Sequence, residues 1–164
     1  MTGYGERDMD LNYRKATIED IDLLTKTRIE VLRAANKLSD DTDMTAVEHQ
    51  SYEYYRKALH DGTHTAYLAF DGDRFAGTGG ISYYQVLPTF HNPSGNKAYI
   101  MNMYTRPEYR RLGIARRMLD ILINDAKEKG ISFITLEATS MGRPLYEKAG
   151  FVAMKDEMIL PEYP

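Results

Sequence analysis

Hydrophobic residues change their spacing along the chain, and these changes divide it into extended and helical segments. Residues 11–15 form a short strand-like stretch. The apolar residues that follow recur every three or four positions, which is the spacing of one helix face. They are Ile21, Leu24, Val31, Leu32 and Ala35. Thr17 precedes them and Asp20 adds negative charge in the first turn, a pattern typical of a helix start. We therefore expect a helix from Thr17 to about Asn36.

A second helix is expected over residues 44–59. It follows an acidic loop at residues 39–43, and the pair Asp61-Gly62 ends it, since glycine is common just after a helix. The acidic loop has two interpretations. Its carboxylates attract a cationic substrate, or they are simply solvated, as runs of charge in loops usually are.

The middle of the chain has the spacing of strands. Residues 63–70 and 75–85 flank the turn-forming tripeptide Asp71-Gly72-Asp73, which predicts a hairpin. A long polar loop over residues 87–97 follows, and long ordered loops in compact domains are often functional. The next strand, residues 98–105, is nearly continuous in apolar and aromatic residues, as expected of a strand covered on both faces.

The last third of the chain alternates again between helix and strand. One helix face is marked by Ala115, Met118, Leu119, Leu122, Ile123 and Ala126, and Gly130 ends this helix. A strand over residues 131–138, a short helix over 143–148 and a final strand over 151–160 complete the pattern. This order predicts one α/β (α+β) domain over residues 11–164, preceded by a flexible tail over residues 1–10.

Composition and charge restrict the sites and partners of the chain. Its 164 residues carry a formal net charge of −3 and no basic stripe, which argues against nucleic acid and favours a cationic or neutral substrate. There is no cysteine, so disulfides, zinc–cysteine sites and a catalytic thiol are excluded. No apolar run approaches the roughly 20 residues that span a bilayer, and residues 1–10 do not resemble a signal peptide. We expect no membrane partner and a cytoplasmic location.

The segment with the clearest chemistry is Arg110-Arg111-Leu112-Gly113-Ile114-Ala115, where a strand leads into a helix. A helix N-terminus presents unpaired backbone N–H groups and the positive end of the helix dipole. Gly113 and Ala115 lack large side chains that would keep an anion away, and Arg110 and Arg111 add positive charge. The segment therefore predicts a phosphate or pyrophosphate site. These residues alone do not say whose phosphate it is.

Two motifs in this order resemble the GNAT superfamily of N-acetyltransferases, in its bacterial, single-domain form. They are Arg-x-x-Gly-x-Ala at residues 110–115 and Leu-Tyr-Glu-Lys-Ala-Gly-Phe at residues 145–151. The opening Tyr13-Arg14-Lys15-Ala16-Thr17 with Asp20 is also similar to that family's first strand and helix. The resemblance implies a mixed sheet with an antiparallel N-terminal half, a central parallel strand pair and helices on both faces. It also implies direct transfer of acetyl from acetyl-CoA to a primary amine of a small molecule or peptide.

The resemblance assigns roles to individual residues. Backbone N–H groups that would bind the CoA pyrophosphate belong to Arg110, Arg111, Leu112, Gly113, Ile114 and Ala115. The edge of the preceding strand, Met103, Tyr104 and Thr105, would pair with the pantetheine arm, and an N–H near Met103 or Tyr104 would contact the developing oxyanion. Tyr146 would lie near the thioester sulfur. A phenol is protonated at neutral pH, so this tyrosine would act as general acid to the departing thiolate; packing of the short helix is its alternative role.

The chain departs from the family in the loop Thr139-Ser140-Met141-Gly142, where many members carry an asparagine. Thr139 or Ser140 would replace its hydrogen bonds to CoA. Glu137, at the end of a strand, is the candidate general base, and a solvated strand-end carboxylate is the equally weighted alternative. Two weaker candidates, for which a surface role is favoured, are Glu30 and His91.

Two further patterns resemble a dinucleotide-binding site and a metal site, but their context argues against both. Gly77-Thr78-Gly79-Gly80 resembles part of a dinucleotide fingerprint, but a strand follows it instead of a helix, so the glycines are expected to permit a bulge. His60 and His64 are four residues apart, but Asp61-Gly62 breaks the helix between them, and we expect no metal site. The alternatives to an enzyme are a non-catalytic CoA-binding module and an interaction module of the same fold. Exposed strand edges also allow a homodimer.

Overall fold

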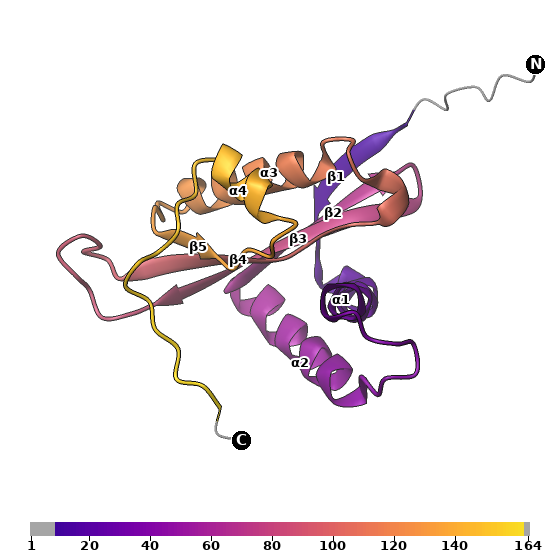
Figure 1. The fold of residues 1–164 in the computed structure, drawn as a ribbon, viewed down its shortest axis with the longest axis horizontal. Coiled ribbons are helices and arrows are strands. Elements are labelled where there is room, and N and C mark those ends of the chain that lie inside the picture. The colour runs from indigo at the N-terminus through magenta and orange to yellow at the C-terminus, as the bar shows by residue number, and fades with distance from the viewer. Residues whose placement is uncertain (1–8, 163–164) are drawn as a thin grey trace, which may run out of the picture.

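The computed structural model describes residues 9–162, and in this range the chain forms one mixed sheet covered by helices on both faces (Figure 1). The sheet has five strands in the order β1-β2-β3-β4-β5. They are β1 (Leu11–Lys15), β2 (His64–Asp71), β3 (Arg74–Gln85), β4 (Asn96–Thr105) and β5 (Ile134–Leu136). The helices are α1 (Ile21–Asn36), α2 (Thr45–Asp61), α3 (Ile114–Glu128) and α4 (Arg143–Lys148). Single 3-10 turns, Ile18–Asp20 and Pro107–Tyr109, precede α1 and α3.

The sheet changes from antiparallel to parallel at its last strand. Strands β1 to β4 pair antiparallel with their neighbours, whereas β4 and β5 pair parallel over Ala98–Ile134, Tyr99–Thr135 and Ile100–Leu136. Because β4 continues to Thr105, its edge beyond Ile100 has no partner strand. The two parallel strands therefore separate half-way along β4.

Each face of the sheet has its own apolar core. On one face α3 buries Met118, Leu119 and Leu122 against the sheet, in a cluster that also contains Ile100 and Tyr146. On the other face α1 and α2 contribute Leu24 and Tyr55, which pack against residues of β2 and β3. Helices α3 and α4 lie together on the first face, and α1 and α2 lie on the second (Figure 1). The predicted fold class is confirmed by this arrangement.

The predicted start of the first helix is also confirmed. Thr17 accepts a hydrogen bond from the Glu19 N–H at 3.3 Å, and Asp20 accepts one from the Thr17 N–H at 2.8 Å, which together form a capping box. Arg14 holds Asp20 through two contacts of 2.7 and 2.8 Å. These local interactions fix the angle at which the chain enters α1.

The expected final strand over residues 151–160 is wrong, and the strand expected over residues 131–138 is reduced to Ile134–Leu136. The final segment passes β5 without pairing. Phe151 still packs against the α3-side core, but the later apolar side chains are exposed, Met158 to 97%. A run of apolar residues predicts an extended segment, but it carries no information on whether a neighbouring edge is long enough to pair with it. As a result the parallel pair forms one end of the sheet.

The tail expected over residues 1–10 falls mostly on residues 1–8, which lie outside the described range, as do residues 163–164. The backbone of Asp10 is held by β2 and its turn, since its N–H donates to Asp71 and its carbonyl accepts from the Gly72 N–H. Within residues 9–162, no helix combines the length and the apolar character needed to cross a membrane.

Candidate functional site

A backbone bulge marks the point where β4 leaves β5. The register of β3 and β4 shifts between the pairs Gly80–Met101 and Thr78–Tyr104, so Asn102 and Met103 together face Gly79. Asn102 has φ of +57°, in the left-handed region that asparagine tolerates better than most residues. Bulges of this kind turn backbone and side-chain groups in new directions, and they are frequent beside active sites.

Helices α1 and α2 both hold the bulged residue. The Asn102 side chain is 9% exposed, and its Oδ1 accepts a hydrogen bond from Arg28 Nη1 at 3.0 Å. Its Nδ2 lies 3.5 Å from the hydroxyl of Tyr55. Neither Arg28 nor Asn102 was predicted from the sequence. Asn102 is a lone amide within the apolar run of β4, and this pattern could have identified it.

A cavity of about 540 Å³ opens directly at this bulge, on the α1 and α2 side of the sheet. We call it the bulge cavity. Its walls come from α1, α2 and strands β3 and β4, together with the start of β2. The lining residues are Arg28, Gln50, Ser51, Tyr54, Tyr55, Thr63, His64, Ser82, Tyr83, Tyr84, Met101 and Asn102. The cavity thus combines aromatic walls with hydroxyl and amide groups next to the unpaired half of β4.

His64 lies at the wall of the bulge cavity as a neutral, buried side chain. Burial, assisted by the charge of Arg28, lowers its pKa to about 4. Its Nδ1 lies 3.0 Å from the Tyr54 hydroxyl and 3.1 Å from that of Ser82, while Nε2 is buried without a hydrogen-bond partner among residues 9–162. A Cβ at Gly80 would lie 2.7 Å from this Nε2, which explains a glycine there. His60 is exposed on α2, and the described residues hold no group of three or more His, Asp or Glu suited to a metal ion.

Glu30, a candidate general base, forms an ion pair with Arg106. Its Oε1 and Oε2 lie 3.0 and 3.1 Å from Nε and Nη2 of Arg106, and the Tyr104 hydroxyl donates to Oε1 at 3.0 Å. Burial raises the pKa of Glu30, but hydrogen bonds from Arg106 and Tyr104 outweigh it and the pKa is lowered. Glu30 therefore ties α1 to the end of β4. His91 is exposed in the long loop and contacts the ring of Phe90.

The segment from Arg110 to Ala115 forms an open, uncapped helix start at the end of β4. Arg111 and Gly113 have φ of +64° and +81°, and no side chain caps α3 at Gly113. The first α-helical hydrogen bond runs from the Arg117 N–H to the Gly113 carbonyl at 3.0 Å, so the N–H groups of Ile114 and Ala115 have no partner within the helix. A Cβ on Gly113 would meet nothing within 4 Å. Gly113 is therefore suited by its positive φ as well as by its small size.

Positive charge is concentrated at this helix start, where the helix dipole alone would disfavour it. The first turn of α3 contains no acidic residue. Arg110 donates to the Thr105 carbonyl at 3.2 Å, Arg111 is exposed, and Arg116 pairs with Asp120 at 3.1 Å. Basic side chains at a helix N-terminus are unfavourable by a few tenths of a kcal/mol or more. A bound anion reverses this, so the segment has the properties of an anion site.

Met103, Tyr104 and Thr105 lie in the half of β4 beyond its last pair with β5. One edge of this half pairs with β3 at Gly77 and Thr78, and the other edge has no partner strand among the described residues. Tyr104 points toward α1, where it contacts Glu30, and Met103 packs against the core beneath α3. Their backbone joins the bulge at Asn102 to the helix start at Gly113. The predicted cofactor residues of β4 and of the turn are thus brought into one continuous path.

Tyr146 lies on α4, on the face of the sheet opposite the bulge cavity. Its side chain is 9% exposed, and its ring packs edge-on against Phe151, with centroids 6.2 Å apart. Burial raises its pKa, and within the described range its hydroxyl has no hydrogen-bond partner. The residue thus packs the short helix and also keeps a protonated, unengaged hydroxyl.

The other predicted residues lie around the end of β5. Glu137 is exposed just beyond Leu136, and after burial its charge is the main factor that raises the pKa of Tyr99. Ala98 and Ile100, the neighbours of Tyr99 in β4, belong to the α3-side core. Because side chains alternate between the two faces of a sheet, Tyr99 lies on the face that carries the bulge cavity. The charge of Glu137 therefore reaches that face. Thr139 accepts from the Gly142 N–H at 3.1 Å and thereby shapes the turn into α4, while Ser140 is exposed.

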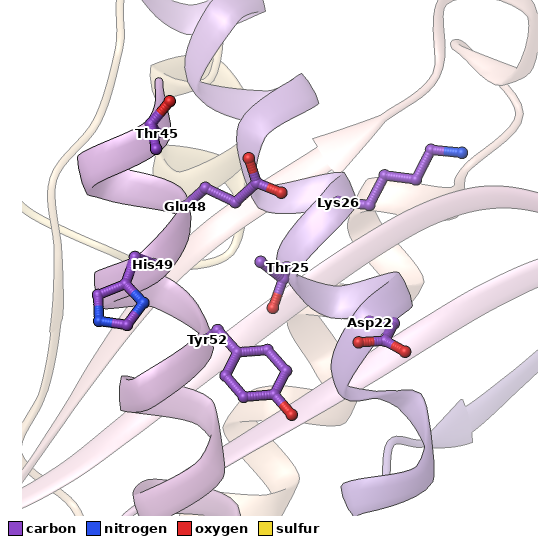
Figure 2. A pocket seen from close by; sticks show the side chains of 7 residues that line it. All are labelled: Asp22, Thr25, Lys26, Thr45, Glu48, His49 and Tyr52. Carbon is purple, nitrogen blue, oxygen red and sulfur yellow. The ribbon is translucent and has the colours of Figure 1, made fainter. Parts of the chain in front are cut away.

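A second hollow lies between α1 and α2, away from these groups. Its volume is about 420 Å³. Figure 2 shows the side chains that line it, all from the two helices: Asp22, Thr25, Lys26, Thr45, Glu48, His49 and Tyr52. No residue of the sheet reaches it. The acidic loop before α2 does not line the bulge cavity either, and Asp43 accepts from the Thr45 N–H at 2.9 Å, a structural role at the start of α2.

Comparison with known proteins identifies the class of protein to which this geometry belongs. The family model described as "Acetyltransferase (GNAT) family" matches residues 32–151. The structure is similar to that of a predicted acetyltransferase with acetyl-CoA from Clostridium acetobutylicum, with a TM-score of 0.84 and 35% identity over 92% of this chain and 96% of that one. A GCN5-related N-acetyltransferase from Ralstonia eutropha JMP134 gives a TM-score of 0.81 and 26% identity over 93% and 98% of the two chains.

Similarity to curated sequences is more limited in extent. The N-acetyltransferase YsnE of Bacillus subtilis (strain 168) is 33% identical over 92 residues, which are 53% of this chain and 55% of that protein. The chain therefore aligns with about half the length of this relative.

Proposed function

Because the chain belongs to the GNAT acetyltransferase family, we propose that it is an acetyl-CoA-dependent N-acetyltransferase that acts on a primary amine. One observation carries this proposal: the unpaired edge of β4 begins at the bulge at Asn102, and from the end of this strand at Thr105 a short turn leads to the uncapped start of α3 at Gly113. A long cofactor with a pyrophosphate in its middle and a thioester at one end needs both an extended binding edge and an anion site. The relative from C. acetobutylicum, whose structure is described with acetyl-CoA, supports the same cofactor here.

The Arg110 N–H already donates to the Pro107 carbonyl at 3.3 Å, so the backbone N–H groups from Arg111 to Ala115 would hold the pyrophosphate. The edge of Met103, Tyr104 and Thr105 would pair with the pantetheine arm. Thr139 or Ser140, beyond β5, would add hydrogen bonds to CoA. Gly113 matters most, because any other residue is strained at a φ of +81° and would bring a side chain into the open anion site.

Acetyl-CoA would supply an activated thioester, and the residues around the bulge would assist its transfer. The neutral amine attacks the carbonyl carbon, a C–N bond forms and the C–S bond breaks. A backbone N–H near Met103 or Tyr104 would donate to the carbonyl oxygen as negative charge develops. Tyr146 would give its proton to the departing thiolate, since burial raises its pKa and keeps it protonated at neutral pH.

The amine must lose a proton before or during the attack, because its ammonium form has no free electron pair. Glu137 would accept that proton, directly or through a water molecule. Its effect on Tyr99, on the face of the bulge cavity, supports this assignment. The nitrogen would lose a second proton, to water, as the C–S bond breaks and the neutral amide forms. Solvent would then take the proton from Glu137 and return one to Tyr146, so that one proton is released for each ammonium ion acetylated.

Calorimetric titration with acetyl-CoA tests this proposal, with ATP and NAD as controls for nonspecific nucleotide binding. Two glycine variants, one just before α3 and one just after it, make the test specific. Gly113→Ala and Gly130→Ala both place alanine at a positive φ, +81° and +70°, in open space, so both cost about 1 kcal/mol of stability. Only Gly113→Ala is expected to weaken acetyl-CoA binding, by tenfold or more. Equal binding by both variants, or no selective binding by the natural protein, contradicts the proposed cofactor site.

A further inference from the structure

Arg28 places a positive charge in the wall of the bulge cavity without a carboxylate to balance it. Its Nη1 donates to Asn102 Oδ1 at 3.0 Å, and in the described part of the chain no Asp or Glu forms an ion pair with it. The half-buried Arg106, by contrast, pairs with Glu30 at 3.0 Å. A partly buried guanidinium that lacks a counter-ion is unfavourable by comparison with a paired one. A negatively charged group bound in the cavity would supply the counter-ion that Arg28 lacks.

The other residues of the bulge cavity leave that charge uncompensated. None of the residues that line it is acidic, and His64, with a pKa of about 4, is neutral at pH 7. Burial raises the pKa of Tyr55 to about 12 and also raises that of Tyr99, and the charge of Arg28 opposes both increases. For His64 the charge of Arg28 adds to the larger effect of burial, and both lower the pKa. The field of the guanidinium thus extends through the cavity. This local positive potential contrasts with the net charge of −3 of the whole chain.

The remaining hydrogen-bond capacity of Arg28 fits a carboxylate. A guanidinium has five N–H donors in a planar fork that matches the two oxygens of a carboxylate. Only Nη1 donates to another described residue, which leaves Nε and Nη2 for a ligand. The hydroxyls of Tyr54 and Ser82, 2.8 Å apart, are neutral and suited to the polar groups beside the carboxylate.

We propose that the acceptor is a small amino carboxylate, such as a free amino acid, whose carboxylate binds Arg28 while its amine lies at the bulge. This inference rests on the proposed acetyl transfer and narrows its substrate class. Because Arg28 contacts the side chain of the bulged residue itself, only a few bonds separate the carboxylate from the reacting amine. An internal lysine of a peptide does not meet this requirement. A free amino acid is a zwitterion without net charge, so this proposal agrees with the expectation of a cationic or neutral substrate that was drawn from the net charge of the chain.

The experiment compares matched acceptors by measuring the release of CoA thiol. Each free amino acid is assayed beside its amide, which keeps the amine and side chain but lacks the carboxylate, and beside its phosphonate analogue. The free acids are expected to have KM values about 30-fold lower than the amides, as for a buried charge pair that loses one partner. Preference for the phosphonates would overturn the assignment of a carboxylate.

Variants locate the effect at Arg28. Arg28→Gln should raise the KM for the free acids to that of the amides of the same variant, so that the preference for the carboxylate is lost. This ratio is measured within one protein, so a general effect of the substitution on the bulge, which Arg28 also holds, does not change it. Lys26→Gln is the matched control, because it removes one positive charge from the same helix. Lys26 lines the second hollow, between α1 and α2, and not the bulge cavity (Figure 2). Thermal melts verify that both variants are folded.

Failure of this inference differs from failure of the proposed function. Thiol release with amides as efficient as with free acids, or an unchanged preference in Arg28→Gln, contradicts the role of Arg28 and leaves acetyl transfer intact. Absence of thiol release with every amine, together with absence of acetyl-CoA binding, contradicts both.

Discussion

Glu30 of α1 and Arg106, which follows β4, are joined by two contacts of 3.0 and 3.1 Å, although 76 positions separate them in the sequence. The Arg106 guanidinium also lies over the ring of Phe75, 4.9 Å from its centroid. This pair fixes the end of β4 to the first helix. It therefore holds the start of the turn that leads to Gly113.

Replacing this carboxylate should affect stability and not proton transfer. Glu30→Gln is expected to lower the free energy of unfolding by about 1 kcal/mol, because the pair is about one-third exposed and partly screened by solvent. Urea denaturation measures this change. The pH dependence of kcat should match that of the natural protein. If the increase of kcat with rising pH were lost in the variant, Glu30 would be the general base.

Tyr146→Phe should lower kcat by about 100-fold or more, because the departing thiolate loses its proton donor. The Kd for acetyl-CoA and the melting temperature should change little, since the hydroxyl of Tyr146 has no hydrogen-bond partner among the described residues. Tyr52→Phe, which removes an exposed hydroxyl from α2, serves as the control. An unchanged kcat in Tyr146→Phe would leave the ring with a packing role alone.

Glu137→Gln distinguishes a base from a solvated carboxylate. If Glu137 accepts the proton of the amine, kcat should fall by tenfold or more at neutral pH, and less at high pH where the free amine predominates. Glu147→Gln, on the exposed face of α4, removes the same charge nearby and should have little effect. Equal rates in the two variants at every pH would assign Glu137 to the solvated surface.

Acidification should destabilise the protein through His64. Folding lowers the pKa of this imidazole from 6.5 to about 4, so the unfolded chain binds a proton at a pH where the folded one does not. The resulting stability is complete above pH 6.5 and is lost as the pH falls toward 4, by about 3 kcal/mol in total. Urea denaturation between pH 7 and pH 4 measures this loss.

Two variants separate His64 from other titrating groups. His64→Asn, which retains a polar atom near Nδ1, should show a smaller loss of stability with acid, whereas exposed His60→Asn should show the same loss as the natural protein. Parallel curves for all three proteins would mean that folding does not shift the pKa of His64.

Local features of this fold could be predicted from the sequence, because they depend on residues close together in the chain. The capping box of Thr17 and Asp20 and the uncapped turn before α3 are of this kind. The contact of Arg28 with Asn102 spans 74 positions, and no spacing pattern encodes it. The bulge at Asn102 depends on the register between two strands. Pairing of residues 151–160 failed for a related reason, since it requires a partner edge that β5 does not provide.

The most direct test of the central claim is a time course of CoA thiol release from acetyl-CoA with and without a primary amine. We expect release that depends on the amine, saturates with its concentration and yields one acetylated amine for each thiol. Tight acetyl-CoA binding without amine-dependent release would instead indicate a non-catalytic CoA-binding module. Absence of both would leave only an interaction module of this fold and would contradict the proposed function.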